Sequence, residues 1–165
     1  MPITCTDGSA EYHEGGCSCG QIRYRLKAPP LFTNCCHCTW CQRETGSAFV
    51  INSLIENDYL EVVQGVPNKI EIPTLSGKSQ TIARCPNCQV ALWSHYTHKH
   101  IAFIRTGTLD YPQNIEPGAH IYISTKQPWV KLPETTPAFE GYYSTRELWP
   151  EKSLERLAAV RDKKA

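Results

Sequence analysis

Four cysteines and a histidine lie within seven consecutive residues, in the stretch CCHCTWC at positions 35–41. A packed core does not need this density of sulfur, whereas metal binding does. If the stretch is extended, alternation places Cys36 and Cys38 on one face and Cys35 and His37 on the other. Cys41, which follows after a further turn, can return to the first face. We therefore predict a zinc ion held by the thiolates of Cys36, Cys38 and Cys41.

The fourth coordination position of this ion decides its chemistry, because catalytic zinc keeps an open position and structural zinc has four protein ligands. His37 could close the site, but alternation points it away from the face of Cys36 and Cys38. We therefore expect Cys35 and His37 to pack or hydrogen-bond beneath the strand. Lone histidines on strands are more often surface or hydrogen-bonded groups. The other candidates for a fourth ligand are His95, His98, His100 and His120.

Three thiolate ligands limit what such a zinc ion can do. They more than cancel the charge of the dication, so this ion activates water poorly compared with zinc bound by neutral histidines. It suits a soft ligand instead. A small-molecule thiol that entered the fourth position would lose its proton, and a carbonyl carbon could then add to or leave from its sulfur. Arg43 directly follows the cluster and is a candidate to offset the added negative charge; the alternative is an ordinary surface arginine.

A second set of cysteines forms two pairs that lie far apart in the sequence. Cys17 and Cys19 lie between glycines, and Cys85 and Cys88 form a C-x-x-C motif. Four thiolates saturate a tetrahedral zinc ion, which then clips two distant parts of the chain together and does no chemistry. The alternative is that one pair remains as buried thiols. We predict a structural zinc at these four cysteines, and hence two zinc ions per chain.

Length and composition favour one small intracellular domain. A chain of 165 residues suits a single core, and a net charge of +1 without a basic block argues against nucleic-acid binding. The N-terminus lacks a signal-peptide pattern, and no apolar run approaches the ~20 residues that span a bilayer. Nine cysteines in C-x-C and C-x-x-C clusters, without a signal peptide, indicate metal binding rather than disulfides. We expect a soluble, cytoplasmic protein that does not bind membranes, and a homo-oligomer is left open.

Hydrophobic alternation predicts a mainly β fold, a meandering antiparallel sheet with little helix. A short helix is expected over 39–46, capped by Thr39 and stopped by Gly46, and a weaker helical pattern covers 151–164. The expected strands cover residues 22–26, 31–38, 47–51, 59–63, 69–73, 80–84, 90–96, 100–106 and 120–124.

Three regions are expected along the chain. Residues 1–14 form a polar N-terminal lead, residues 15–130 a zinc-binding domain, and residues 131–165 a tail rich in proline and aromatic residues with a short helix. We expect the tail to dock on the domain, because its aromatic side chains would otherwise be exposed.

Four motifs of the sequence resemble the family of glutathione-dependent formaldehyde-activating enzymes, which includes the centromere protein V-like proteins. The resemblance runs from about Gly15 to about Trp129. Gln89 departs from the pattern, because a glycine commonly follows the second C-x-x-C in this family. The motifs are GCSCGQIRY at 16–24, CHCTWCQR at 36–43 with Gly46-Ser47, CPNC at 85–88, and HIY at 120–122 with Trp129.

The resemblance implies an Mss4-like fold, mainly antiparallel β structure with zinc knuckles. It also implies a structural zinc at Cys17, Cys19, Cys85 and Cys88, and a catalytic zinc at Cys36, Cys38 and Cys41. The family activity is carbon–sulfur lyase chemistry that interconverts S-hydroxymethylglutathione with formaldehyde and glutathione. The residues themselves leave two other functions open: a non-catalytic binding or scaffold protein with two structural zinc ions, and a glutathione carrier.

Overall fold

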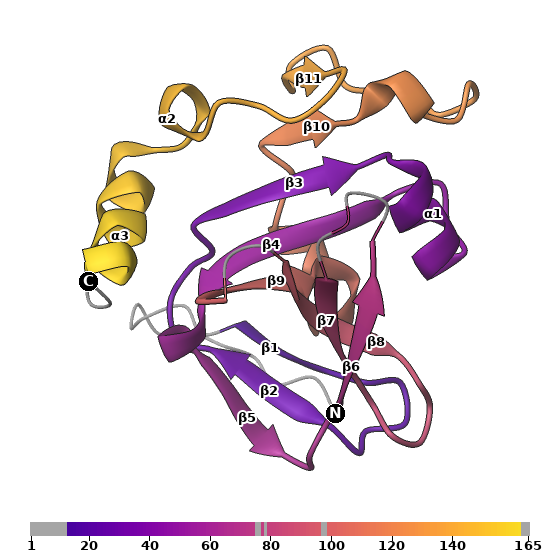
Figure 1. The fold of residues 1–165 in the computed structure, drawn as a ribbon, viewed down its shortest axis with the longest axis vertical. Helices are drawn as coiled ribbons and strands as arrows, with labels where there is room; N and C mark the ends of the chain where they lie inside the picture. Colours follow the sequence, from indigo (N-terminus) through magenta and orange to yellow (C-terminus); the bar gives the residue numbers. More distant parts are fainter. Residues whose placement is uncertain (1–12, 75–76, 78, 97–98, 163–165) are drawn as a thin grey trace.

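Strands dominate the computed structural model, which describes residues 13–74, 77, 79–96 and 99–162. Within these ranges the strands form two sheets (Figure 1). The smaller sheet is antiparallel, in the order β1-β2-β5. Its strands are β1 (His13–Gly16), β2 (Arg23–Leu26) and β5 (Leu60–Gln64). The mainly β fold with little helix is thereby confirmed.

The larger sheet has the order β11-β10-β3-β4-β9-β8-β7-β6. From β3 to β6 its neighbours are antiparallel, but β10 is parallel both to β3 and to β11, so the prediction of a simple meander is wrong at this edge. Its strands are β3 (Phe32–Cys36), β4 (Val50–Glu56), β6 (Asn68–Pro73), β7 (Ser79–Arg84), β8 (Ala91–Tyr96), β9 (Ile101–Arg105), β10 (Ala119–Ile121) and β11 (Ala138–Phe139).

Several element boundaries differ from the sequence prediction, and those around α1, β4 and β10 bear on the site. Helix α1 (Thr39–Thr45) is capped by Cys38 and not by Thr39, because the Cys38 sulfur accepts the backbone N–H of Cys41 at 3.3 Å. Gly46 ends α1 in the left-handed region as predicted, and β4 starts only at Val50 and runs beyond the predicted 47–51. Strand β10 ends three residues early, because Tyr122 has a φ of 55° and turns the chain into a 3-10 turn, η4 (Ile123–Thr125).

Two hydrophobic cores lie on opposite faces of the larger sheet. The first joins the smaller sheet to strands β4, β7, β8 and β9, and Ile55 and Ile104 are completely buried in it. The second joins β3, β4, β9 and β10 to the C-terminal segment, through residues such as Leu54 and Ile121. Neighbouring residues on β4, Leu54 and Ile55, therefore serve different cores, as strand alternation requires.

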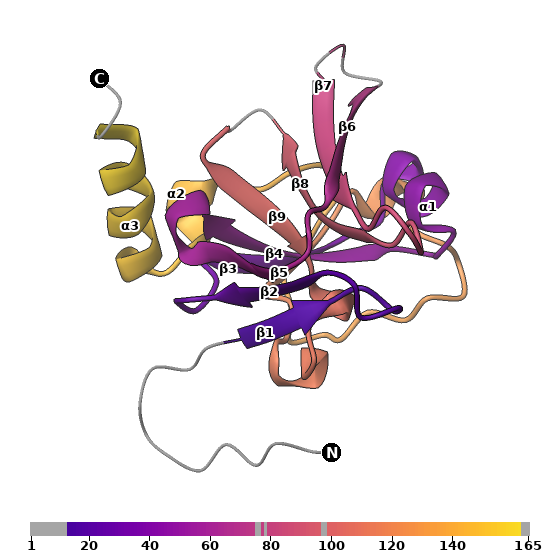
Figure 2. The ribbon, with the colours of Figure 1, turned by 90° about the horizontal axis from the view of Figure 1, so that it is seen from below.

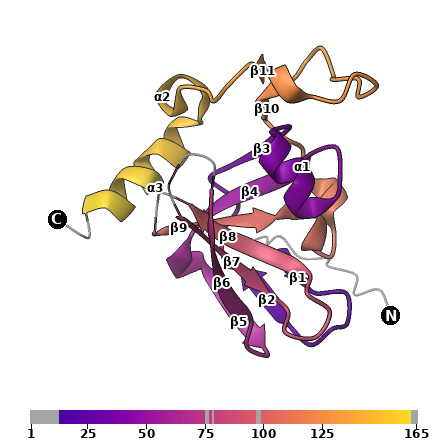
Figure 3. The same ribbon diagram turned by 45° about the vertical axis from the view of Figure 1, so that its right-hand side comes forward.

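The C-terminal segment after β10 runs past the end of the larger sheet formed by β3, β10 and β11 (Figure 3). It contains α2 (Thr145–Leu148) and α3 (Glu151–Asp162). Trp149 is buried and stacks on Phe32, with ring centroids 5.6 Å apart. Arg156 of α3 donates two hydrogen bonds to the carboxylate of Glu56, at 2.8 and 2.6 Å. In Figure 2, α3 and α1 lie on opposite sides of strands β6 to β9. The aromatic tail is thus docked on the sheet.

The predicted division into three regions stays a prediction. Residues 1–12 of the expected N-terminal lead lie outside the described ranges, and β1 already begins at His13.

No helix in the described part of the chain combines the length and the apolar character needed to cross a membrane.

Candidate metal centres and the cavity beside them

The four cysteines of the predicted structural site lie together, although 66 residues separate Cys19 from Cys85. The Cys19 sulfur lies 3.5 Å from that of Cys17 and 3.6 Å from that of Cys85. Sulfurs at the corners of a tetrahedron around zinc, with Zn–S bonds of about 2.3 Å, are about 3.8 Å apart, so the group fits a zinc ion closely. Together with Cys88, these residues could hold a metal between the β1–β2 turn and the β7–β8 turn.

Each of the two turns is closed in the same way. Gly20 follows Cys19 with a φ of 76°, and Gln89 follows Cys88 with a φ of 61°. The departure from the family glycine at position 89 therefore leaves the turn intact, although a side chain in the left-handed region is strained. The Gln89 amide compensates by donating to the Pro86 carbonyl at 2.8 Å. Backbone N–H groups also face the sulfurs, as Ile22 donates to Cys17 at 3.2 Å.

The three cysteines of the predicted catalytic site also lie together. The sulfurs of Cys36, Cys38 and Cys41 are within 4.8 Å of one another, a spacing that fits three ligands of one ion. Cys36 is the last residue of β3, Cys38 caps α1, and Cys41 lies in its first turn. Cys38 keeps an extended backbone, with φ −66° and ψ 151°, and this is why the alternation rule holds for it beyond the end of the strand.

No histidine in the described part of the chain joins this group of three sulfurs. His37 instead lies with Cys35 and His120 in a separate, buried group, as alternation predicts for His37 and Cys35. The His37 Nε2 atom is 3.0 Å from His120 Nδ1 and 3.5 Å from the Cys35 sulfur. His95 contacts the Asn57 side chain at 2.9 Å. Of the remaining candidates, His98 lies outside the described residues, and His100 is not among the residues that line the site.

The pKa shifts differ between the buried group of Cys35, His37 and His120 and the group of Cys36, Cys38 and Cys41. Burial, with a smaller contribution from Cys41, raises the pKa of Cys35 to about 12, so its thiol stays protonated. Burial, and then repulsion by His120 and Lys126, lowers the pKa of His37 to about 4, so its imidazole stays neutral. Cys38 behaves differently. Hydrogen bonds from the thiols of Cys36 and Cys41, with backbone N–H groups at the start of α1, lower its pKa, so Cys38 is the first of the three to form a thiolate.

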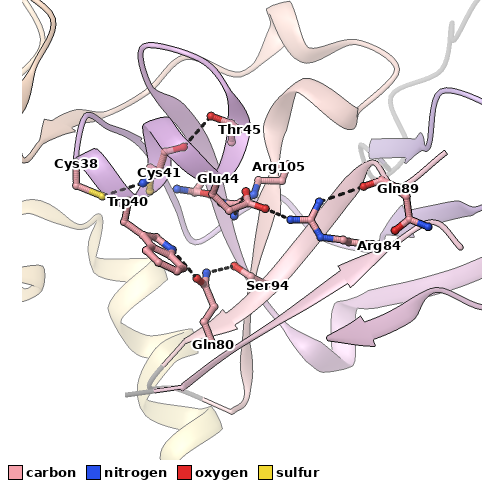
Figure 4. Close-up of polar contacts among 11 residues, drawn as sticks. Cys38, Trp40, Cys41, Glu44, Thr45, Gln80, Arg84, Gln89, Ser94 and Arg105 are labelled. Carbon is pink, nitrogen blue, oxygen red and sulfur yellow. Dashed lines mark hydrogen bonds and ion pairs between the residues drawn. The ribbon is translucent and has the colours of Figure 1, made fainter. Parts of the chain in front are cut away.

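A buried carboxylate connects the two cysteine sites (Figure 4). Glu44, on α1 three residues after Cys41, forms ion pairs with Arg84 and with Arg105, and only 6% of its side chain is exposed. Arg84 directly precedes Cys85 and also donates to the Gln89 carbonyl at 3.1 Å. Glu44 thereby fixes the helix that carries Cys41 to the turn that carries Cys85.

A cavity of about 560 Å³ lies against the sulfurs of Cys36, Cys38 and Cys41. This volume is typical of small-molecule sites. Its walls come from β3, β4, β7, β8, β9, β10, the start of α1 and the C-terminal segment. Besides the three cysteines, the lining residues are Asn34, Thr39, Trp40, Asn52, Leu54, Thr74, Gln80, Ser94, Tyr96, Ile101, Phe103, Arg105, Ile121, Tyr122, Tyr142, Thr145, Trp149 and Leu157.

Comparison with known proteins identifies the family of the chain. Residues 12–125 match the family model described as "Glutathione-dependent formaldehyde-activating enzyme". The chain belongs to this family. A protein of Halomonas elongata named "Putative glutathione-dependent formaldehyde-activating enzyme" is 27% identical over 141 residues, which cover 78% of this chain and 87% of that protein. A crystal structure of a Rhodobacter sphaeroides protein has 16% identity and a TM-score of 0.45, and covers 63% of this chain and 91% of its own.

The residues predicted from the sequence and the residues that line the cavity are only partly the same. Arg43, the predicted charge-balancing residue, is exposed on α1 and is not among the lining residues, so its role stays a prediction. Sequence reasoning missed Asn34, Asn52 and Arg105, which are buried and line the cavity. Polar residues inside otherwise apolar strands were the available signal. The C-terminal segment, which lies beyond the family match, supplies part of the cavity wall.

Proposed function

We propose that the protein is a zinc-dependent carbon–sulfur lyase that interconverts a thiol–aldehyde adduct with its thiol and aldehyde. The family and the name of its relative point to glutathione and formaldehyde, so S-hydroxymethylglutathione is the reference substrate. One observation carries the proposal: three cysteine sulfurs lie together at the wall of a cavity, and the described residues add no fourth ligand. Two zinc ions per chain are proposed, one for each cysteine group.

The reaction needs one bond to break and one proton to leave. In the lyase direction the carbon–sulfur bond of the hydroxymethyl adduct breaks, its electron pair stays on the sulfur, the hydroxyl group loses its proton to water, and the aldehyde carbonyl forms. Zinc held by Cys36, Cys38 and Cys41 would favour the thiolate form of the substrate sulfur. The protein keeps these ligands in place through the N–H of Cys41 on Cys38 and through Glu44, which anchors α1.

Two non-catalytic functions predict different behaviour. A scaffold with two structural zinc ions needs a fourth protein ligand at Cys36, Cys38 and Cys41, and none of the described histidines lies in that group. A glutathione carrier would bind the thiol without turnover. The cavity beside the incomplete cysteine group favours the lyase over the scaffold, because substrate must reach the open position.

Exchange spectroscopy tests the proposal directly. With the zinc content verified, we expect the protein to accelerate the interconversion of formaldehyde, a thiol and their adduct. Glutathione is the first thiol to measure, followed by a panel of other small thiols. An unchanged rate with glutathione would show that glutathione is not the thiol of the substrate. Unchanged rates with every thiol would remove the lyase, and tight binding without exchange would indicate the carrier.

A further inference from the structure

Charge is scarce in the lining of the cavity beside Cys36, Cys38 and Cys41. Apart from the three cysteines, Arg105 is the only residue with a charged side chain among the described lining residues. Its guanidinium is already engaged, because it donates to the Asn52 side chain at 2.6 Å and forms an ion pair with Glu44 at 3.2 Å. Glutathione carries two carboxylates, and a carboxylate that leaves water without a cationic partner is strongly disfavoured.

The polar side chains on one wall of the cavity satisfy each other. Trp40 donates from its indole nitrogen to the Gln80 side-chain oxygen at 3.2 Å, and the Gln80 amide contacts the Ser94 hydroxyl at 2.9 Å (Figure 4). Two polar atoms of lining residues, the Asn34 side-chain oxygen and the Nε of Arg105, have no partner within the described structure, but both are shielded from solvent. Among the described lining residues no cationic side chain is therefore free to pair with a carboxylate.

Much of the remaining lining is apolar, although hydroxyl groups such as those of Thr39, Tyr122 and Thr145 interrupt it. Register places Leu54 beside Phe103 on neighbouring strands, and the row next to it holds Asn52 and Arg105. The cavity therefore has an apolar floor beside a narrow polar row. Its apolar wall includes Leu54, Ile101, Phe103, Ile121, Trp149 and Leu157.

Part of this wall belongs to the chain's own C-terminal segment. Tyr142, Thr145, Trp149 and Leu157 line the cavity, and all four follow residue 125, where the family match ends. The segment is firmly seated, because Trp149 stacks on Phe32 and its indole nitrogen donates to the Tyr143 hydroxyl at 3.1 Å. It thus gives this family member an apolar wall at a fixed position.

We infer that the cavity selects a formaldehyde adduct of an uncharged, apolar thiol with a bulky group, such as an aromatic thiol, over the adduct of glutathione. This inference rests on the proposed lyase function and names its substrate class. The apolar group would lie against Leu54, Phe103 and the C-terminal wall, while the sulfur lies at the three cysteines. Formaldehyde is too small to fill a cavity of about 560 Å³, so the thiol must supply the bulk.

A matched pair of thiols isolates charge from size. We expect kcat/KM for the formaldehyde adduct of benzyl mercaptan to exceed that of 4-(mercaptomethyl)benzoate, and that of glutathione, by at least about ten-fold. The non-reactive sulfides of the two benzyl compounds, titrated by tryptophan fluorescence, should differ in Kd by a similar factor. Equal values for the neutral and charged compounds, or a preference for glutathione, would overturn the inference and leave the lyase proposal standing.

Variants of Leu157 test where the charge is sensed. Leu157→Arg should weaken binding of the neutral benzyl sulfide and strengthen binding of its 4-carboxy analogue by about five-fold or more. Leu157→Gln should weaken the neutral compound without helping the charged one. Ala158→Arg, on an exposed position of the same helix that does not line the cavity, should change neither. If Leu157→Arg and Ala158→Arg behave alike, the inference fails.

The two proposals fail in different ways. Absence of exchange with every thiol at verified zinc content contradicts the lyase alone, because the sulfide titrations report on the cavity without turnover. Equal affinity for the neutral and charged sulfides contradicts the substrate class alone.

Discussion

The two cysteine groups offer a metal ion the same ligand atoms in different surroundings. The group of four lies in two turns, faces backbone N–H groups, and has no cysteine in the lining of the large cavity beside the other group. The group of three lies where a strand meets a helix, and all its members line that cavity. The group of four is also accessible, because Cys19 is exposed and Cys88 lines a separate cavity of about 540 Å³. The number of thiolates therefore distinguishes the two groups better than access does. A complete shell can be placed wherever it ties the chain, whereas an incomplete one is useful only where a ligand can reach it.

Removal of a ligand from the group of four should have the largest effect. Such a site can contribute on the order of 10 kcal/mol to folding, and Cys85 is completely buried in the first core. We expect Cys85→Ser to lower Tm by at least about 15 °C or to abolish the cooperative transition, as measured by calorimetry with metal analysis. A variant that kept its Tm after losing one equivalent of zinc would show that the clip is not structural.

Removal of a ligand from the group of three should affect activity far more than stability. Serine can still accept the N–H of Cys41, because serine is a good N-cap, so Cys38→Ser should keep α1 folded. We expect loss of one zinc per chain and a fall in exchange rate of at least about 100-fold, with a change in unfolding free energy below about 2 kcal/mol. Collapse of the fold in Cys38→Ser would instead make this site structural, and would favour the scaffold.

Loss of the Glu44 ion pairs, which connect the two cysteine groups, should have an intermediate effect on the stability of the protein. Glu44→Gln leaves two arginines facing a neutral group at a buried position, and we expect it to cost about 1–3 kcal/mol in urea unfolding. Both zinc equivalents should remain, because no sulfur is removed. A double-mutant cycle with Arg84→Gln measures the link itself. Additive effects in that cycle would mean that α1 is held independently of the turn at Cys85.

Much of this comparison could be predicted from the sequence, because the determinants are local. Spacing separates Cys36 and Cys38 from Cys35 and His37, and paired cysteines identify the group of four. Gly46 ends α1 as predicted, since glycine adopts its positive φ without strain. The cap of α1 was missed because a sulfur takes the place that an oxygen usually takes.

The long-range parts could not be predicted, for a physical reason. The parallel pairing of β10 with β3 and β11 joins segments that local alternation treats as separate strands. The cavity depends on that pairing, because it brings the C-terminal segment over the second core. Asn34 and Arg105 belong to one polar row only once β3, β4 and β9 are in register. A row across three strands leaves no periodic signal in any one of them.

The exposed cation Arg43 should give the smallest effect. It is on α1, one residue before Glu44, and outside the cavity lining, so it can reach the three thiolates only through solvent-screened attraction. We expect Arg43→Ala to lower the exchange rate by about two- to five-fold at low salt, and by less at high salt. Arg43→Lys keeps the charge and should retain the rate. A loss that is large and independent of salt would mean that Arg43 contacts the substrate. Equal rates for Arg43→Ala and the unchanged protein at every salt concentration would instead leave Arg43 an ordinary surface arginine.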